Sequence, residues 1–311
     1  MDQKNNLDSN NDIKILNLNS EQVGNEIFEE LKDIKYINLK ELHLSNCGIS
    51  DLKGLELLKF EKLEILDLSS NEDISDISIL EKVNFKELKV LNLHENDISD
   101  IAVLEKVNFE KLEKLDLSDN KISDIKILEK ASFKNLKELY LYGNEISDIS
   151  VLGFCNFIQL EILDLQYNPI SDLTPLEDFD CPNLKTLNLN ACDISDIDIL
   201  ENVHFDKLEV LNFTENQISD ISVLEKVNFK ELKELRLTFN QISDIKVLEK
   251  AKFEKLETLT LNVNQISDID GLENIKFDNL KTLDLEDNQI DGEQFAETIK
   301  KLKSKIPKFI C

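Results

Sequence analysis

The stretch FKELKVLNLHENDISDIAVLEKVN fills residues 85–108 and recurs as FEKLEKLDLSDNKISDIKILEKAS at 109–132 and FKNLKELYLYGNEISDISVLGFCN at 133–156. Each copy therefore begins 24 residues after the one before it. A unit this short cannot bury its apolar side chains alone, so it must stack on its neighbours. The period predicts one elongated domain that grows by adding layers, although 311 residues would ordinarily suggest two domains.

The copies share the pattern L-x-x-L-x-L-x-x-N-x-I, which in the first copy is Leu88, Leu91, Leu93, Asn96 and Ile98. This pattern resembles the leucine-rich repeat, and the resemblance extends roughly over residues 13–299. The ISDI element that ends the pattern resembles the internalin and SDS22-like branches of that family. The resemblance implies an α/β fold: a curved horseshoe solenoid with a parallel β-sheet on the concave face and short α or 3-10 helices on the convex face. Those branches typically use shorter units, so their partners do not transfer to this chain.

A short alternation of apolar and polar residues predicts a strand in each unit, as at Leu91, Asn92 and Leu93. The asparagine after the strand can bond the backbone of turns that have left the sheet. We expect a ladder of these asparagines that is interrupted at Cys47 and Cys192. The ladder positions are Asn96, Asn120, Asn144, Asn168, Asn216, Asn240, Asn264 and Asn288.

The next stretch, Ser99 to Val107, predicts one or two turns of α or 3-10 helix that begin at Ser99 as the capping residue. A phenylalanine then recurs once per unit, and we expect these rings to form a second buried column, with Tyr36 and Cys181 as exceptions. One extra residue near Glu72 and Asp73 is expected to bulge from a turn. The phenylalanine column consists of Phe60, Phe85, Phe109, Phe133, Phe157, Phe205, Phe229, Phe253 and Phe277.

Both ends depart from the repeat, as the terminal layers of a stack must. Residues 1–12 are polar and are expected to form a disordered tail. Residues 13–35 are expected to form an N-terminal cap with a helix from Ser20 to Ile34, and tandem repeats fill residues 36–290. A C-terminal capping helix from Asp291 to Lys303, followed by a tail, is expected within residues 291–311.

The chain carries 63 acidic against 36 basic residues, a formal net charge of −27. Such a field repels phosphate backbones and anionic lipids, so neither nucleic acid nor a membrane is an expected partner. No basic region followed by an apolar run occurs, and no segment is long and apolar enough to span a membrane, so we expect a soluble cytoplasmic protein. The sequence does not fix the oligomeric state, and a monomer is the expectation.

Four of the five cysteines replace buried residues of the repeat, so a disulfide framework is not expected: Cys47, Cys155, Cys181 and Cys192. No set of nucleophile, base and orienting residue is apparent, and no phosphate-binding or calcium-binding loop occurs. His94 shares the inner surface with another histidine, but the two are far apart in the chain. We therefore expect neither catalysis nor a bound metal or cofactor.

The solvent-facing strand positions, and the two residues after each strand, are not fixed by stacking. Three of the four tyrosines fall there, namely Tyr140, Tyr142 and Tyr167. Neighbouring strands lie about 4.8 Å apart, so Asp116 and Asp164 should flank Tyr140. An aromatic ring beside a carboxylate suits a lysine or arginine from a partner. The alternative is that these are ordinary exposed tyrosines, which strands favour.

The only arginine, Arg236, lies on the same predicted surface near Phe239, and the two form a candidate second anchor. An ion pair of Arg236 with Glu234 that serves solubility is the alternative. His94 completes the candidate partner-binding residues of this face.

On the outer side, Phe154 and Ile158 replace residues that are charged in other units. They are a possible convex contact patch. The alternative, which we favour from the sequence, is that the two side chains cover each other beside Gly153.

These observations predict a non-enzymatic protein-interaction scaffold that binds a partner with basic residues on its concave face. Two alternatives stay open. One is a regulatory subunit of a phosphatase complex, as the SDS22-like resemblance implies. The other is a structural spacer whose inner face binds nothing specific.

Overall fold

A computed structural model describes residues 13–33 and 38–311 of the protein. These residues form two compact units. The first runs to Glu145 and includes Cys155–Gln159, and the second consists of Ile146–Phe154 and Leu160–Cys311. The expected tail at residues 1–12, the end of the expected N-terminal cap and Tyr36 lie outside the described residues.

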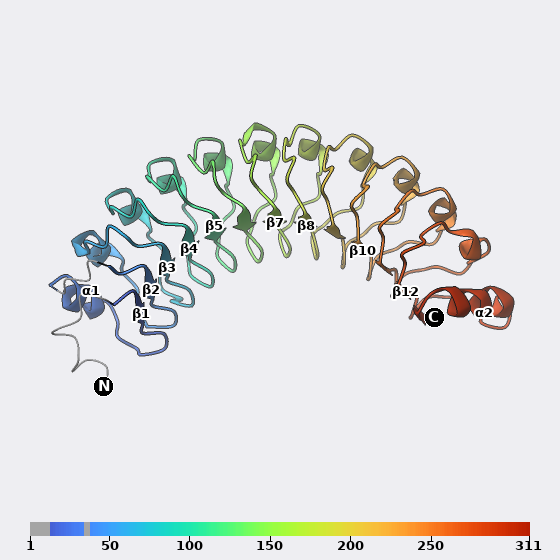
Figure 1. Cartoon of the computed structure of the whole chain (residues 1–311), viewed down its shortest axis with the longest axis horizontal. Helices are drawn as coiled ribbons and strands as arrows, with labels where there is room; N and C mark the ends of the chain where they lie inside the picture. Colours follow the sequence, from blue (N-terminus) through green and yellow to red (C-terminus); the bar gives the residue numbers. More distant parts are fainter. Residues whose placement is uncertain (1–12, 34–37) are drawn as a thin grey trace. The chain divides into compact units, whose positions relative to one another are not determined.

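In the first unit, each repeat contributes one short parallel strand to a sheet that follows chain order. The strands are β1 (Ile15–Asn17), β2 (Glu41–His43), β3 (Ile65–Asp67), β4 (Val90–Asn92), β5 (Lys114–Asp116) and β6 (Glu138–Tyr140). The helices are α1 (Glu26–Leu31), η2 (Lys53–Leu57), η3 (Ser78–Glu81), η4 (Ala102–Glu105) and η5 (Lys126–Glu129), of which the η elements are 3-10 helices. Figure 1 shows the strands along the concave side of this unit and the 3-10 helices along its convex side.

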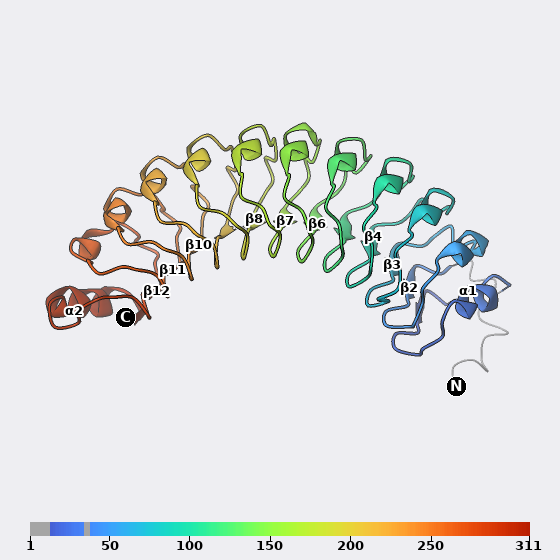
Figure 2. The same cartoon turned by 180° about the vertical axis from the view of Figure 1, so that it is seen from behind.

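The second unit repeats the same arrangement, seen from behind in Figure 2. Its parallel strands are β7 (Ile162–Asp164), β8 (Thr186–Asn188), β9 (Val210–Asn212), β10 (Glu234–Arg236), β11 (Thr258–Thr260), β12 (Thr282–Asp284) and β13 (Lys308–Ile310). Its helices are η6 (Ser150–Phe154), η7 (Thr174–Glu177), η8 (Asp198–Glu201), η9 (Ser222–Glu225), η10 (Lys246–Glu249), η11 (Leu272–Asn274) and α2 (Ala296–Lys305). Each unit is therefore a repeat solenoid with a parallel sheet on its concave face, as the repeat pattern predicts.

Exact register between layers places equivalent residues side by side, and this builds the core as columns. Leu91 of β4 pairs with Leu66 of β3 and with Leu115 of β5, and all three side chains are fully buried. The predicted phenylalanine column is confirmed, because each of its rings is buried, and Cys181 is buried at the same repeat position.

The asparagine ladder is also confirmed, and Asn120 shows its geometry. Its Oδ1 accepts the N–H of Ile98 at 3.0 Å, and its Nδ2 donates to the carbonyls of Leu93 and Leu117 at 2.9 and 3.0 Å. At one predicted interruption, the Cys192 thiol donates to the carbonyl of Leu165 at 3.6 Å. A thiol therefore keeps a weak version of the contact made by the amide nitrogen.

Asn71 is a ladder member that sequence reasoning missed, because the extra residue directly follows it. Glu72 and Asp73 form an exposed turn, as predicted. In this turn the N–H of Ile74 bonds the carbonyl of Asn71 at 2.8 Å, although the ladder would direct it to the next asparagine. The Oδ1 of Asn96 is consequently buried with no hydrogen-bond partner among the described residues.

The predicted helix start at Ser99 is wrong, because η4 begins at Ala102 and its N-cap residue is Ile101. The Oδ1 of Asp100 accepts the N–H of Ala102 at 2.8 Å, and this bond leads the chain into η4. The same bond from the aspartate of ISDI recurs along the chain, for instance from Asp124 to Lys126. A carboxylate satisfies an early helical N–H better than the neighbouring hydroxyl because it accepts as an anion.

The ends of the chain differ in detail from the expectation. Ser20 adopts a left-handed conformation and lies well before α1, so it does not cap that helix. Residues 308–310, expected as a tail, form β13 and pair with β12. An apolar Phe309 at the open edge of β12, opposite Leu283, explains the extra strand. That α1 and α2 act as caps stays a prediction.

Candidate interaction surfaces

Tyr140 lies on the concave face of the first unit, and Asp116 is its lateral partner in the sheet, as predicted. The ring is not open on all sides. Lys114 Nζ lies 4.5 Å from the ring centroid, and the hydroxyl of Tyr140 donates to Glu138 Oε2 at 3.1 Å. The same Glu138 oxygen lies 3.4 Å from Lys114 Nζ. One face of Tyr140 therefore already carries a cation from its own chain.

Tyr142 reaches over one complete layer to His94. Their ring centroids lie 5.7 Å apart, and the Tyr142 hydroxyl lies 3.4 Å from His94 Nδ1. The layer between them carries Ser118, which is 0% exposed and whose Oγ has no hydrogen-bond partner among the described residues. Because serine is small, the two larger rings can meet above it.

Carboxylates surround these rings. Asp119 Oδ2 lies 3.6 Å from His94 Nδ1, and Asp116 Oδ1 accepts the N–H of Ser118 at 3.1 Å. We call the set formed by His94, Asp116, Asp119, Tyr140 and Tyr142 the acidic aromatic patch. It combines two rings held against each other with two carboxylates on one face of the sheet.

Tyr167 and Asp164 belong to the second unit. Tyr167 is 54% exposed. Asp164 is engaged within its own unit: Oδ1 accepts the N–H of Gln166 at 3.1 Å, and Oδ2 accepts from the Nδ2 of Asn188 at 3.2 Å. The three predicted tyrosines therefore come from both units, Tyr140 and Tyr142 from the first and Tyr167 from the second. The acidic aromatic patch contains residues of the first unit only.

Arg236 forms an ion pair with Glu234, which was the alternative to a partner-binding role, and its guanidinium lies 2.5 Å from Glu234 Oε2. Phe239, three residues later in the chain, remains 51% exposed. The second predicted anchor therefore offers an exposed ring beside an arginine that already has an internal partner.

Phe154 and Ile158 are 71% and 43% exposed on the outer side. That the two side chains cover each other stays a prediction, because Phe154 belongs to the second unit and Ile158 to the first.

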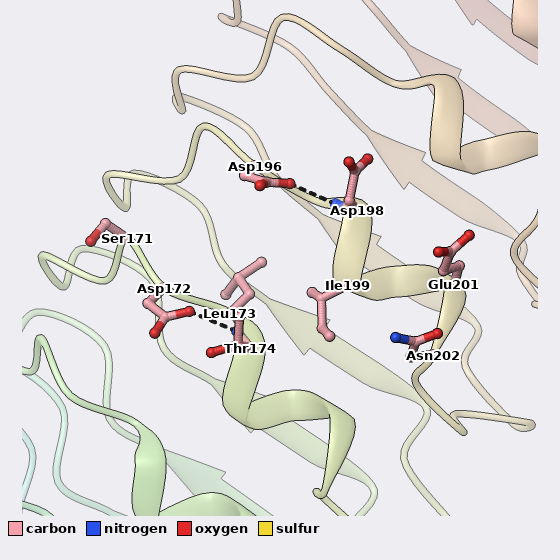
Figure 3. Close-up of a pocket in the computed structure, with 9 residues that line it drawn as sticks. All are labelled: Ser171, Asp172, Leu173, Thr174, Asp196, Asp198, Ile199, Glu201 and Asn202. Atoms are coloured by element: carbon pink, nitrogen blue, oxygen red, sulfur yellow. Dashed lines mark hydrogen bonds between the residues drawn. The ribbon is translucent and has the colours of Figure 1, made fainter.

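Shallow grooves separate the 3-10 helices on the convex side. Figure 3 shows one of about 280 Å³ between η7 and η8, where Asp172 and Asp196 point to the N–H groups of Thr174 and Asp198. A comparable groove of about 530 Å³ lies between η4 and η5. The grooves thus follow from the repeat, and their aspartates are the helix-starting residues.

The lysines beside the sheet form ion pairs with glutamates of the neighbouring layers. Lys89 Nζ lies 2.7 Å from Glu64 of the preceding layer, and Lys137 lies 2.7 Å from Glu113. Glu64 also pairs with Lys40, and the hydrogen bonds from Lys40 and Lys89 lower the pKa of Glu64 to about 2. These pairs leave the carboxylates of the inner face as its main charges.

Burial disfavours the reactive thiolate form of three cysteines. Burial raises the pKa of Cys155, Cys181 and Cys192 to about 12. Among residues 13–33 and 38–311, no group of three or more His, Cys, Asp or Glu side chains is arranged to hold a metal ion. Nor does this part of the chain contain a helix of the length and apolar character needed to cross a membrane.

The fold and its repeat define the class of protein. The family model of leucine-rich repeats, in two-copy units, matches residues 37–82, 86–130, 110–154, 158–202, 206–250 and 254–303, and the chain belongs to the leucine-rich-repeat family. Proteins of this family generally act as scaffolds for protein interactions.

Solved structures give the more particular likeness. An internalin (inlF) from Listeria monocytogenes is 29% identical, with a TM-score of 0.70 over 88% of this chain and 81% of that one. A leucine-rich-repeat protein of Leptospira interrogans is 22% identical, with a TM-score of 0.58 over 97% of this chain and 90% of that one, and shows the shared fold alone. A search of curated proteins gives no match.

The chain thus resembles the internalins, as its ISDI element indicated. Sequence reasoning singled out Tyr167 and Phe239 but missed that both belong to one row of left-handed residues, directly before the ladder position of each layer. Turn-forming residues at some of its positions, such as Asn46 and Gly143, were the available signal.

Proposed function

We propose that the chain is a non-enzymatic protein-interaction scaffold and that the acidic aromatic patch binds a partner through basic side chains. The contact of Tyr142 with His94 beside Asp119 carries the proposal. Two rings held in place lose little entropy on binding, and aromatic residues are frequent at the energetic centres of interfaces. A carboxylate next to such rings adds attraction for a cation.

Charge supports a basic partner. The chain has a formal net charge of −27, and the lysines beside the sheet are paired between layers. Complementary charge steers a partner toward the site and increases the rate of association more than the final affinity. Binding through this patch is therefore expected to weaken as salt is added.

Lys114 determines where the cation of a partner fits. It occupies one face of Tyr140, so a second cation there would meet a like charge. The side chain of Asp119 is 45% exposed, and among the described residues its ion-pair partner is His94 and not a lysine or arginine. We place the basic group of the partner beside Asp119 and the rings of Tyr142 and His94.

The second unit contributes further candidate contacts to the proposal. Tyr167 and Asp164 give that unit an acidic and aromatic pair of its own, and Arg236 with Phe239 forms a second anchor. Phe154 and Ile158 remain a possible contact on the convex side.

Affinity capture on the tagged chain, followed by mass spectrometry, tests the proposal. The wild type is compared with a variant in which Tyr140, Tyr142 and Tyr167 are replaced by alanine and with Asp119→Asn. We expect one captured protein to be reduced about tenfold by each variant and by high salt. Glu105→Gln, an exposed change on the convex side, serves as the control and should leave capture unchanged. Equal capture by wild type and triple variant would remove the patch from the function.

Two different results would favour the alternatives. A phosphatase catalytic subunit among the captured proteins would favour the regulatory-subunit hypothesis. Retention of biological activity after the inner face is randomised would favour the spacer hypothesis.

A further inference from the structure

The first and last strands of the chain each have one open edge. Among the described residues, β1 pairs with β2 alone and β13 pairs with β12 alone, and both pairings are parallel. An open edge presents unpaired backbone N–H and C=O groups to any strand that can reach it. Because the two edges face opposite ways along the strand order, β13 of one molecule can be continued by β1 of another.

Apolar side chains are left partly open at the same two edges. Leu16 of β1 is half-buried, whereas its register partner Leu42 is 0% exposed. Phe309 of β13 is likewise half-buried opposite Leu283, which is 0% exposed. Ile15, beside Leu16, is 55% exposed. One further layer on either edge would bury this apolar surface, as it does everywhere inside the stack.

The backbone bonds of the repeat specify how the two edges join. The Lys281 carbonyl accepts the N–H of Lys308, the first residue of β13, at 2.8 Å, and Pro307 lies one layer after Lys281. Ile15 is the first residue of β1, so its N–H in a second copy can donate to the Pro307 carbonyl. Proline has no N–H, but the equivalent N–H of Lys281 points back to Glu257. Pro307 therefore leaves the outer edge available.

A second backbone bond fits the same joint. The Leu285 N–H donates to the carbonyl of Ile310, the last residue of β13, at 2.9 Å, and Cys311 lies one layer after Leu285. Asn17 is the last residue of β1, so its carbonyl in a second copy can accept the N–H of Cys311. The exposed Cys311 side chain would then take the position at which Leu285 is buried.

The helices beside the two edges carry opposite charge. Residues 26–33, which include α1, hold four acidic side chains and one lysine, whereas residues 296–308, which include α2, hold five lysines and one glutamate. Helices of successive layers pack on each other, as α1 does on η2 and α2 on η11. In a continued stack, α2 of one copy would meet α1 of the next. Pairing of like ends would instead bring like charges together, so charge favours unlike ends.

Part of the charge on α2 is not used within the chain. Lys301 lies 3.2 Å from Glu273, and Lys305 donates to a backbone carbonyl at 2.6 Å. Lys300 and Lys303 are exposed and have no ion-pair or hydrogen-bond partner in the described part of the chain. These two lysines are available to the acidic helix of a second copy.

We propose that copies of this chain associate head to tail, with β13 of one copy pairing in parallel with β1 of the next. Such a joint is heterologous, so every copy in a row keeps a free edge for another copy. The dilute protein is a monomer, as expected from the sequence, and association increases with concentration. This association goes beyond the scaffold function proposed above and does not use the acidic aromatic patch.

Analytical ultracentrifugation of the full-length chain, from about 1 μM to 1 mM, tests the association. The mean mass should rise with concentration and fall when salt is added. The N-end variant Glu26→Lys with Asp33→Lys, and the C-end variant Lys300→Glu with Lys303→Glu, should each associate about tenfold more weakly.

Mixing the two variants identifies which ends meet. The mixture contains one natural pair of unlike ends, so two-copy species should form with the affinity of the wild type. This recovery also shows that both variants are folded. The control Glu105→Lys with Glu129→Lys makes the same change in net charge on η4 and η5 and should not weaken association.

The Cys311 thiol reports on the joint itself. Its rate of labelling in the wild type should fall several-fold between dilute and associated protein, and it should stay unchanged in the C-end variant over the same range. The proposal is overturned by a constant monomer mass up to about 1 mM, by normal association of either variant alone, by a mixture that does not recover, or by unchanged labelling in associated protein. None of these results bears on partner capture by the acidic aromatic patch, so the two proposals fail separately.

Discussion

Replacing Asn120 by alanine removes one member of the asparagine ladder and isolates a single buried N–H. The N–H of Ile98 bonds Asn120 Oδ1 at 3.0 Å and lies in the buried turn after β4. The carbonyls that receive the amide nitrogen keep other donors, since Asn96 also bonds Leu93 and Asn144 also bonds Leu117. The main loss is therefore the pairing of the Ile98 N–H.

An unpaired buried N–H costs about 1–3 kcal/mol, and the lost bonds from the amide nitrogen add about 1 kcal/mol. We expect Asn120→Ala to lower the free energy of unfolding by about 2–4 kcal/mol. Asn120→Cys should lose less, because Cys192 shows that a thiol at this position still donates to a carbonyl.

The insertion provides a matched control at Asn96. Its Nδ2 makes equivalent bonds, to Leu68 and Leu93 at 3.2 and 2.8 Å, but its Oδ1 has no partner among the described residues. Asn96→Ala should therefore cost only about 1 kcal/mol. Equilibrium unfolding in urea, followed by circular dichroism, measures both values. Equal losses in the two variants, with unchanged m-values, would refute the role assigned to the amide oxygen.

Three further outcomes are expected. Phe109→Ala should lower the free energy of unfolding by about 3–5 kcal/mol because the ring is buried, whereas Phe154→Ala should change it by less than about 0.5 kcal/mol; similar losses in urea would contradict the assigned burial. The pKa of Glu64 is lowered from 4.5 to about 2, so its ionised form contributes stability that is present above pH 4.5 and lost as the pH falls through 2. The free energy of unfolding of Glu64→Gln should therefore decline less steeply than that of wild type over this pH window. Parallel curves for the two proteins would argue against the lysine pairs. A thiol reagent at mildly alkaline pH should label exposed Cys311 quickly and the buried Cys155, Cys181 and Cys192 only after denaturation, and rapid labelling of the native protein beyond Cys311 would show that the stack opens readily.

The repeat made most of the fold predictable because each layer obeys the same local rules. The leucine columns, the asparagine ladder and the buried phenylalanines follow from residue type at a fixed spacing. The helix start was misplaced at Ser99 because serine and aspartate are both capping types, and only geometry shows that Asp100 supplies the oxygen that reaches the N–H of Ala102. Strand β13 was missed because a terminal segment lacks the periodicity that identified the others.

The candidate site was less predictable than the fold. The neighbours of Tyr140 across the sheet follow from register, and Asp116 lies where expected. Strand register does not determine where the end of a long side chain lies. The contact of Lys114 with the ring of Tyr140 and the contact of Tyr142 with His94 were therefore not predictable. Both contacts depend on rotamers and on the size of the residue between them.

The turn at Glu72 and Asp73 bears on how such a chain changes over generations. Strands β3 and β4 still match residue for residue, with Leu66 beside Leu91, although 25 positions and not 24 separate them. The added length is absorbed where the backbone is exposed, and its local penalty is one orphaned amide oxygen. Unequal exchange between gene segments of slightly different length would therefore preserve the lateral alignment of the layers, so new inner surfaces can be assembled without refolding the old ones.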